Sequence, residues 1–256
     1  MVSLQFSGQF PSGNIILASC DSKYFNEFGI PLAYSCNEAG NNLHLHVMDP
    51  EPMDYATASL VNSDLDIELT MSSETGGPKT REYYSCNRFI VAPHFIRNGV
   101  NKLLIIDTDC LVMKHLEFPD AKLGLFLRDP IPGTVGWENE GTHVAAGIVY
   151  YTRESLTFAD EVSTTLRNNK LVWFIDQVAL WRAYQVLSSR HGTMFADPLY
   201  EECHVFGSND MDWEFIDGTN IWTGKGPRKY TNETYCNKQS YYMDMFLGID
   251  KRFWIK

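Results

Sequence analysis

The amino-acid sequence predicts an α/β fold in which a mostly parallel central sheet is flanked by helices. Strand-like runs alternate with helical patterns over residues 14–112, which is the arrangement typical of a parallel sheet. The apolar run 103–106 also has the character of a strand buried on both faces. With 256 residues and 44% hydrophobic content, the chain can bury one sizeable core.

Each element of the first half has a local signal. The apolar run at 14–21 ends in turn-forming residues, and the helical pattern that follows at 22–40 is interrupted near Gly29 to Pro31. Alternating apolar and polar residues at 42–49 predict the next strand. The remaining expected elements are a helix at 54–62, a strand at 65–71, a helix at about 80–97 and a strand at 102–107.

The second half is less regular. We expect strands at 123–127 and 146–152, a helix with the face Phe158, Val162 and Leu166, and a helix at 176–187. Beyond these the chain is rich in aromatic residues, Gly and Asp with weak periodicity, which predicts an irregular C-terminal part. No linker or repeat interrupts the sequence, so we expect a single domain over 1–256.

Charge and cysteine content exclude several classes of protein. The net charge of −11 argues against binding to nucleic acid or to anionic membranes, since both need positive surface. The six cysteines have neither CxxC spacing nor the density of a disulfide scaffold, which favours reduced thiols. No apolar run approaches the roughly 20 residues of a membrane span, and no secretory signal is apparent, so we expect a cytoplasmic protein.

Two acids close the strand at 102–107. If strand geometry persists, Asp107 and Asp109 project to one face, where the two carboxylates would repel each other. A divalent cation resolves this, because Mg²⁺ and Mn²⁺ prefer hard oxygen ligands and can also neutralise a diphosphate. The alternative is that one acid caps a turn while the other is solvated.

The sequence resembles the GT-A glycosyltransferases, and within them the retaining family 8 type that includes glycogenin and bacterial lipopolysaccharide galactosyltransferases. Five motifs carry the resemblance in the family's order: IILASCDSKY (15–24), NRF (87–89), IIDTDCLV (105–112), HVAAGIVYY (143–151) and FIDQVAL (174–180). It implies a Rossmann-like GT-A domain that uses Mn²⁺ or Mg²⁺ to move a hexose, with retention, from UDP-glucose or UDP-galactose to a glycan, lipid or protein acceptor. Residues 14–112 would bind the nucleotide, and 113–256 would bind the acceptor and close the site.

The resemblance also implies roles for the residues that hold the nucleotide. The backbone of Ala18, Ser19 and Cys20 and the side chain of Asp21 would hold the base, with Tyr24 close to the same pocket. Asp21 or Ser22 is equally explained as the cap of the next helix.

The same motifs assign the metal and phosphate ligands. Asp107 and Asp109 would bind the metal, and Thr108 would offer its backbone to the ribose. Arg88 would reach a phosphate or tie down the acids, and a structural ion pair is the alternative.

The sugar-binding motifs depart from the family in one place. Ala145 replaces the family's sugar-contacting Asn, while Ala146 and Gly147 still allow a ligand close to the backbone. Gly147 is equally explained by packing against a neighbour. By resemblance, Asp176 would bind sugar hydroxyls and Gln177 would lie near the anomeric carbon, while the alternative for Asp176 is a helix N-cap.

The segment 220–230 is basic within an acidic chain and resembles the family's closing motif. Lys225 and Lys229 would grip the diphosphate, and Gly224 and Gly226 would let backbone amides approach the anion. Thr223 stands where the family has a metal-binding His, so the third ligand would be His204, His191, or water and diphosphate. The alternative for this basic segment is a solvated turn.

Two other classes of function stay open. The text around IIDTDCLV is also similar to the nucleophile motif of haloacid dehalogenase-like phosphatases, with Asp107 as nucleophile and Asp109 as acid/base. The replacements at Ala145 and Thr223 also allow a non-catalytic nucleotide-sugar-binding protein.

Overall fold

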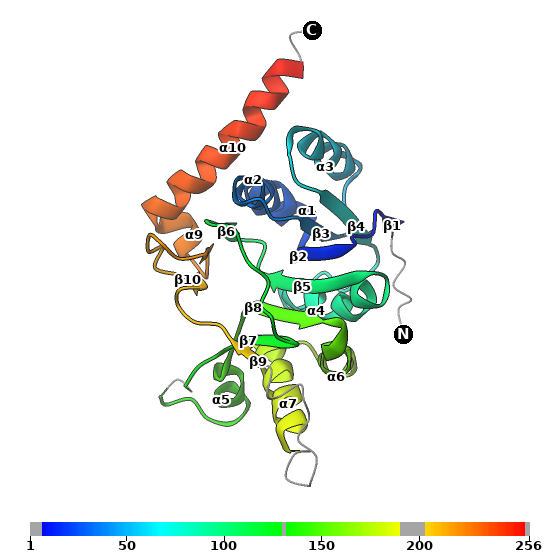
Figure 1. The fold of residues 1–256 in the computed structure, drawn as a ribbon, viewed down its shortest axis with the longest axis vertical. Helices are drawn as coiled ribbons and strands as arrows, with labels where there is room; N and C mark the ends of the chain where they lie inside the picture. Colours follow the sequence, from blue (N-terminus) through cyan, green and yellow to red (C-terminus); the bar gives the residue numbers. More distant parts are fainter. Residues whose placement is uncertain (1–6, 130–131, 190–202, 254–256) are drawn as a thin grey trace.

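The computed structural model describes residues 7–129, 132–189 and 203–253 (Figure 1). One eight-stranded sheet has the order β1-β4-β3-β2-β5-β8-β7-β9. Its strands are β1 (Ser7–Gly8), β2 (Gly13–Asp21), β3 (Leu43–Met48), β4 (Leu69–Glu74), β5 (Val100–Ile106), β7 (Leu123–Leu127), β8 (Val144–Thr152) and β9 (Cys203–Val205). The block β4-β3-β2-β5 is parallel throughout, whereas β8 runs antiparallel to both of its neighbours.

A second, three-stranded sheet combines β6 (Cys110–Val112), β10 (Met211–Asp212) and β11 (Ile221–Thr223). This sheet pairs β6, which directly follows Asp109, with β11, which directly precedes residues 224–230, called the basic loop below. The helical elements are α1 (Ser22–Tyr24), the π-turn η1 (Phe25–Gly29), α2 (Ile30–Ala39), α3 (Pro52–Asp64), α4 (Arg81–Arg97), α5 (Gly136–Thr142), the 3₁₀ turn η2 (Arg153–Ser155), α6 (Leu156–Asn168), α7 (Ile175–Ser189), α9 (Arg228–Thr231) and α10 (Glu233–Phe253).

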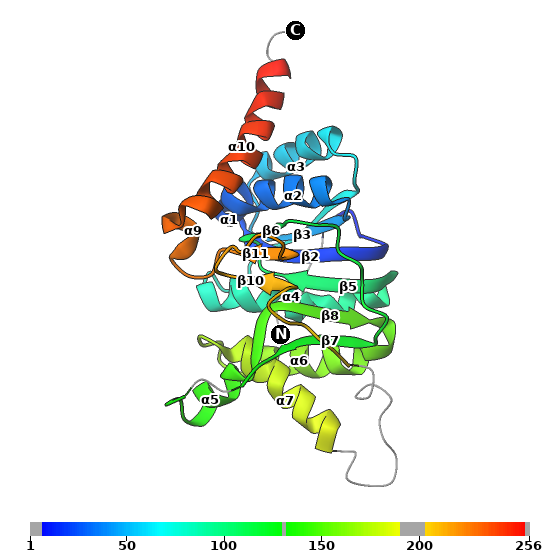
Figure 2. The same ribbon diagram turned by 60° about the vertical axis from the view of Figure 1, so that its left-hand side comes forward.

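Two apolar clusters cover the two faces of the large sheet. Ile16 and Ala18 of β2 belong to the cluster with α2, α3, β6 and α10, whereas Ile15 and Leu17 belong to the cluster with α4, α6 and α7. Successive strand residues point to opposite faces, so β2 and β5 are apolar on both sides. The helix-flanked α/β fold expected from the sequence is therefore confirmed, and its layers are visible in Figure 2.

Several predicted boundaries were wrong. The strand expected at 65–71 lies at Leu69–Glu74, and the helix interrupted near Gly29 instead continues through a π-turn. The alternation at 42–49 does not mark a half-exposed strand, because β3 is central and both His44 and His46 are fully buried. Beyond the short elements at 203–231, the C-terminal part ends in a 21-residue helix. This helix, α10, runs along α2 and on past it (Figure 1), and Tyr242 is buried in their contact.

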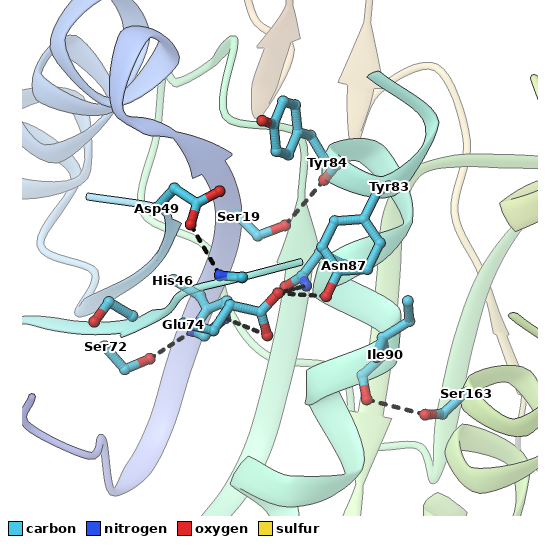
Figure 3. A network of polar contacts seen from close by, with 12 residues as sticks. Ser19, His46, Asp49, Ser72, Glu74, Tyr83, Tyr84, Asn87, Ile90 and Ser163 are labelled. Carbon is cyan, nitrogen blue, oxygen red and sulfur yellow. Dashed lines mark hydrogen bonds and ion pairs between the residues drawn. The ribbon is translucent and has the colours of Figure 1, made fainter. Parts of the chain in front are cut away.

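A buried polar network connects β3 and β4 to α4 (Figure 3). Glu74 accepts hydrogen bonds from the Tyr83 hydroxyl and, at 2.8 Å, from Asn87 Nδ2. His46 Nε2 lies 3.6 Å from the other oxygen of the Glu74 carboxyl. Burial raises the pKa of Glu74, but its interactions with His46, Tyr83 and Asn87 outweigh this, so the pKa lies below its ordinary value. The network fixes the start of the helix that carries Arg88.

Replacing Glu74 by glutamine is expected to lower the free energy of unfolding by about 1–3 kcal/mol at pH 7, because an amide presents N–H groups to buried donors. Since the folded pKa of Glu74 is lowered, its stabilisation is present above the unfolded pKa of about 4.3 and is lost as the pH falls through the folded value. Urea unfolding of the wild type and the variant at a series of pH values measures this difference in the free energy of unfolding. The exposed Glu154→Gln is the control, and a difference that persists undiminished in acid contradicts the prediction.

Candidate active site

A cleft opens at the carboxyl ends of the parallel strands and is closed on one side by the basic loop. Of the residues to which the sequence assigned a part in catalysis or in holding the nucleotide sugar, all but Ala18 and Gly224 line it. Those lining the cleft are Ser19, Cys20, Asp21, Tyr24, Arg88, Asp107, Thr108, Asp109, Ala146, Gly147, Asp176, Gln177, Lys225, Gly226 and Lys229. Segments as far apart as residues 19 and 229 therefore meet in one place.

The two acids occupy a turn rather than an extended strand. β5 ends at Ile106, and the Cys110 amide donates to the Asp107 carbonyl at 3.2 Å, which closes the turn between β5 and β6. Arg88 Nη2 lies 2.8 Å from Asp107 Oδ1 and 3.6 Å from Asp176 Oδ2. It also donates to the Ala146 carbonyl at 3.1 Å. One buried guanidinium thus joins the acidic turn to the segment of Asp176.

Asp109 is held by the basic loop. Lys229 Nζ lies 2.6 Å from Asp109 Oδ2 and donates to the Tyr24 hydroxyl at 2.9 Å. The Asp109 carbonyl accepts from the Tyr235 hydroxyl and the Gly224 amide, both at 2.8 Å. The Gly224 amide itself is therefore bonded within the protein, and the approach of other backbone amides of this loop to an anion stays a prediction. A Cβ at Gly224 would lie 2.9 Å from the Asp109 carbonyl oxygen, so close backbone contact explains this glycine.

The nucleotide end of the cleft combines caps with fixed backbone. Asp21 Oδ1 accepts from the Tyr24 amide at 2.8 Å, which confirms the capping interpretation of Asp21. Thr108 Oγ1 donates to the Ser19 carbonyl at 2.9 Å and locks the ends of β2 and β5 together. Ala18 is fully buried inside the sheet, so the prediction that its backbone contacts the nucleotide base was wrong.

The opposite wall carries the Asp-Gln pair. Helix α7 begins at Ile175, so Asp176 lies within its first turn and the N-cap interpretation was wrong. The Asp176 carboxylate instead accepts a hydrogen bond from the backbone N–H of Gln177 at 2.9 Å and faces Arg88. Gln177 Oε1 accepts from Arg128 Nη2 at 2.9 Å. No motif had pointed to Arg128.

Other parts of the wall were also missed or left open by the sequence. The lining includes Trp173, Trp213 and Met211, whose sequence context carries no motif. A Cβ at Gly147 would lie 2.8 Å from Met211 Sδ and 3.2 Å from Asp107 Oδ2. Packing therefore suffices to explain this glycine, and a side chain there would press on the acidic turn.

Burial and neighbouring charge shift several pKa values in the cleft. Burial raises the pKa of Asp107 above its ordinary value, and the neighbouring Asp109 and Asp176 add to this although Arg88 opposes it. Burial likewise raises the pKa of Asp176, again against Arg88. The pKa of Lys225 is lowered by burial and then by Arg128. Titratable groups with pKa values shifted in this way are typical of functional sites.

Asp107 and Asp109 each present one carboxylate oxygen that could bind a metal ion. Among the described residues, Asp107 Oδ2 and Asp109 Oδ1 have no ion-pair partner, whereas the other oxygen of each acid is paired. Within that same part of the chain, no group of three or more His, Cys, Asp and Glu is arranged to hold a metal. Two carboxylates fit Mg²⁺ or Mn²⁺ when phosphate oxygens and water complete the shell.

The candidates for a third ligand separate clearly. Thr223 lines the cleft, whereas His204 lies on the edge strand β9, packs against Phe206 and is not among the lining residues. His191 lies outside the described residues. The expectation that His204 completes the shell therefore gains no support.

The sheet and its flanking helices define the class of fold: it is the GT-A fold of glycosyltransferases. The chain is similar to the bifunctional glycosyltransferase WbbM, with a TM-score of 0.61 and 11% identity over 95% of this chain and 52% of WbbM. It is similar to the galactosyltransferase LgtC, solved with donor and acceptor sugar analogues, with a TM-score of 0.55 and 13% identity over 91% of this chain and 95% of LgtC. It is also similar to the glycosyltransferase GlyE of Streptococcus pneumoniae, with a TM-score of 0.57 and 11% identity over 93% of this chain and 64% of GlyE. The chain thus spans about half of WbbM and nearly all of LgtC.

At such identities the likeness establishes the fold alone. No protein-family model and no curated protein sequence matches the chain. None of the helices in the described ranges is long and apolar enough to cross a membrane.

Proposed function

We propose that the chain is a metal-dependent, retaining glycosyltransferase of the family 8 type, which transfers a hexose from UDP-glucose or UDP-galactose to a glycan, lipid or protein acceptor. One observation carries the proposal: within a GT-A fold, the acidic turn at Asp107 and Asp109 meets the basic loop at Lys225 and Lys229 in one cleft. That combination suits a diphosphate held between a cation on the acids and ammonium groups.

The proposed chemistry is a substitution at the anomeric carbon. The bond from that carbon to the diphosphate oxygen breaks, the acceptor oxygen bonds from the same face, and the acceptor proton passes to the departing phosphate. Lys225 and Lys229 stabilise the charge that develops on the diphosphate. The metal ion, when bound, adds further stabilisation of the same leaving group.

The remaining residues would orient the sugar. Asp176, fixed by Arg88, would accept hydrogen bonds from sugar hydroxyls, and Gln177 would lie beside the anomeric carbon. Neither group is a strong base, which suits a reaction driven by positioning and electrostatics. The base and ribose would lie along Ser19, Cys20 and Thr108.

The alternatives keep a place in the test. A phosphatase would use Asp107 as nucleophile, but Arg88 already occupies one oxygen of this carboxyl, and the similar structures named above are all glycosyltransferases. A binding protein without turnover would bind the nucleotide sugar and release nothing.

Asp109→Asn is expected to abolish manganese-dependent binding of the donor and turnover, since the substitution removes a ligand charge and breaks the pair with Lys229. The measurements are thermal shift with UDP-glucose and UDP-galactose, with and without Mn²⁺, and release of UDP. The exposed Asp160→Asn is the matched control.

The outcomes separate the hypotheses. Full activity in Asp109→Asn rejects the metal site. Donor binding by the wild type without UDP release indicates a binding protein, and phosphate release from small phosphoesters indicates a phosphatase.

A further inference from the structure

Gln177 is held by a partner that fixes which end of its amide faces the cleft. Arg128 Nη2 lies 2.9 Å from Gln177 Oε1. A guanidinium has only donors, so the atom that faces it must be the amide oxygen. The two ends of a glutamine amide are otherwise hard to distinguish, but here the chemistry of the partner decides the orientation. The amide nitrogen therefore points away from Arg128.

Arg128 is itself anchored. Its Nε donates to the Thr142 carbonyl at 2.5 Å, and its backbone amide donates to the His143 carbonyl at 3.0 Å. Within the described ranges it forms no ion pair with a carboxylate, and burial lowers its pKa without an opposing acid. Arg128 therefore serves two carbonyl oxygens, one from the backbone and one from Gln177.

The surroundings keep this arrangement rigid. His143 stacks on Trp181 of α7 with ring centroids 4.3 Å apart. Arg182 of α7 pairs with Glu140 of α5 at 2.6 Å. The chain between β7 and β8 is thus tied to α7 at two further places, both C-terminal to Arg128 and to Gln177 in their segments.

The Gln177 nitrogen is the end left for a ligand. Gln177 lines the cleft, and in the described part of the chain its Nε2 has no hydrogen-bond partner. Nε2 is not one of the fully buried polar atoms without a partner, so this nitrogen is accessible to solvent.

We propose that Arg128 is a positioning residue that holds Gln177 so that its Nε2 donates a hydrogen bond to a substrate oxygen in the cleft. Gln177 then acts as a donor toward the substrate, while its amide oxygen accepts from Arg128. The inference rests on the proposed function, because the substrate oxygen belongs to the sugar, the diphosphate or the acceptor of that reaction.

The test compares kcat and KM of the wild type with Arg128→Ala, Gln177→Ala and the double variant, using the nucleotide sugar that the wild type turns over. Each single variant is expected to lower kcat by about 10- to 100-fold with little change in KM, and the double variant by no more than either. Arg97→Ala, which breaks the exposed pair with Asp160 and removes no residue that lines the cleft, is the control and is expected to keep wild-type kcat.

Gln177→Glu distinguishes positioning from a structural effect. Its carboxylate would pair with Arg128 and preserve the fold, but it has no N–H for the cleft, so its kcat is expected to match that of Gln177→Ala. An active Gln177→Glu, or an Arg128→Ala within about threefold of an active wild type, overturns the inference alone. Absence of wild-type turnover with every nucleotide sugar overturns the proposed function, and this inference with it.

Discussion

Arg88→Ala is expected to lower the free energy of unfolding by about 3 kcal/mol and to abolish turnover. The substitution leaves Asp107 and Asp176 without their shared cation, and an unpaired buried charge typically costs about 3–5 kcal/mol. We take the low end because the Asp107 side chain is 34% exposed. For a chain of this length the melting temperature would fall by roughly 10 °C, which thermal unfolding with a check of reversibility can measure.

The matched control for Arg88 lies at the end of the same helix. Arg97 pairs with Asp160, but the two side chains are 50% and 40% exposed. Arg97→Ala is therefore expected to cost at most about 1 kcal/mol. If Arg88→Ala is no less stable than Arg97→Ala, Arg88 does not hold the acids as the distances indicate.

Lys229→Met is expected to lower kcat/KM by at least about 100-fold. The ammonium group compensates Asp109 and, in the proposed reaction, stabilises the departing diphosphate, so the loss falls on the transition state. Methionine preserves most of the buried stem. UDP release at saturating and limiting donor concentrations separates the effects on kcat and KM.

The neighbouring cation provides the comparison for Lys229. Arg228 pairs with Glu214 at 3.1 Å in an exposed position. Arg228→Met removes a charge from the same short helix and is expected to leave kcat/KM within about twofold of the wild type. Equal losses in the two variants would mean that only the net positive charge of the loop matters.

The sequence predicted the elements whose signals are local. The strand at 123–127 was placed correctly to the residue, because its short apolar run is bounded by polar and turn-forming residues. The acids and the basic loop were found because charged residues next to a buried strand, or concentrated in an acidic chain, demand an explanation. Their contact at 2.6 Å spans 120 residues of sequence, and only the resemblance to a family placed them together.

Other features depend on tertiary context. His44 and His46 made β3 look half-exposed, although it is buried on both faces. Their ring nitrogens form hydrogen bonds with Thr70 and Ser72 of the neighbouring strand β4, which allows the burial. The 21-residue α10 lies in a stretch rich in aromatic residues, Gly and Asp, which we interpreted as irregular, so this helix was missed. The bond between Arg128 and Gln177 joins residues 49 positions apart and leaves no trace in either local segment.

The anchoring of the basic loop has a consequence for the energetics of binding. The Gly224 amide and the Tyr235 hydroxyl already hold the Asp109 carbonyl without a ligand, and Lys229 already reaches its carboxylate. A loop preorganised in this way would lose little conformational entropy on binding the proposed donor. A larger share of the contact energy then appears as affinity, and the rate of association is not limited by folding of this loop.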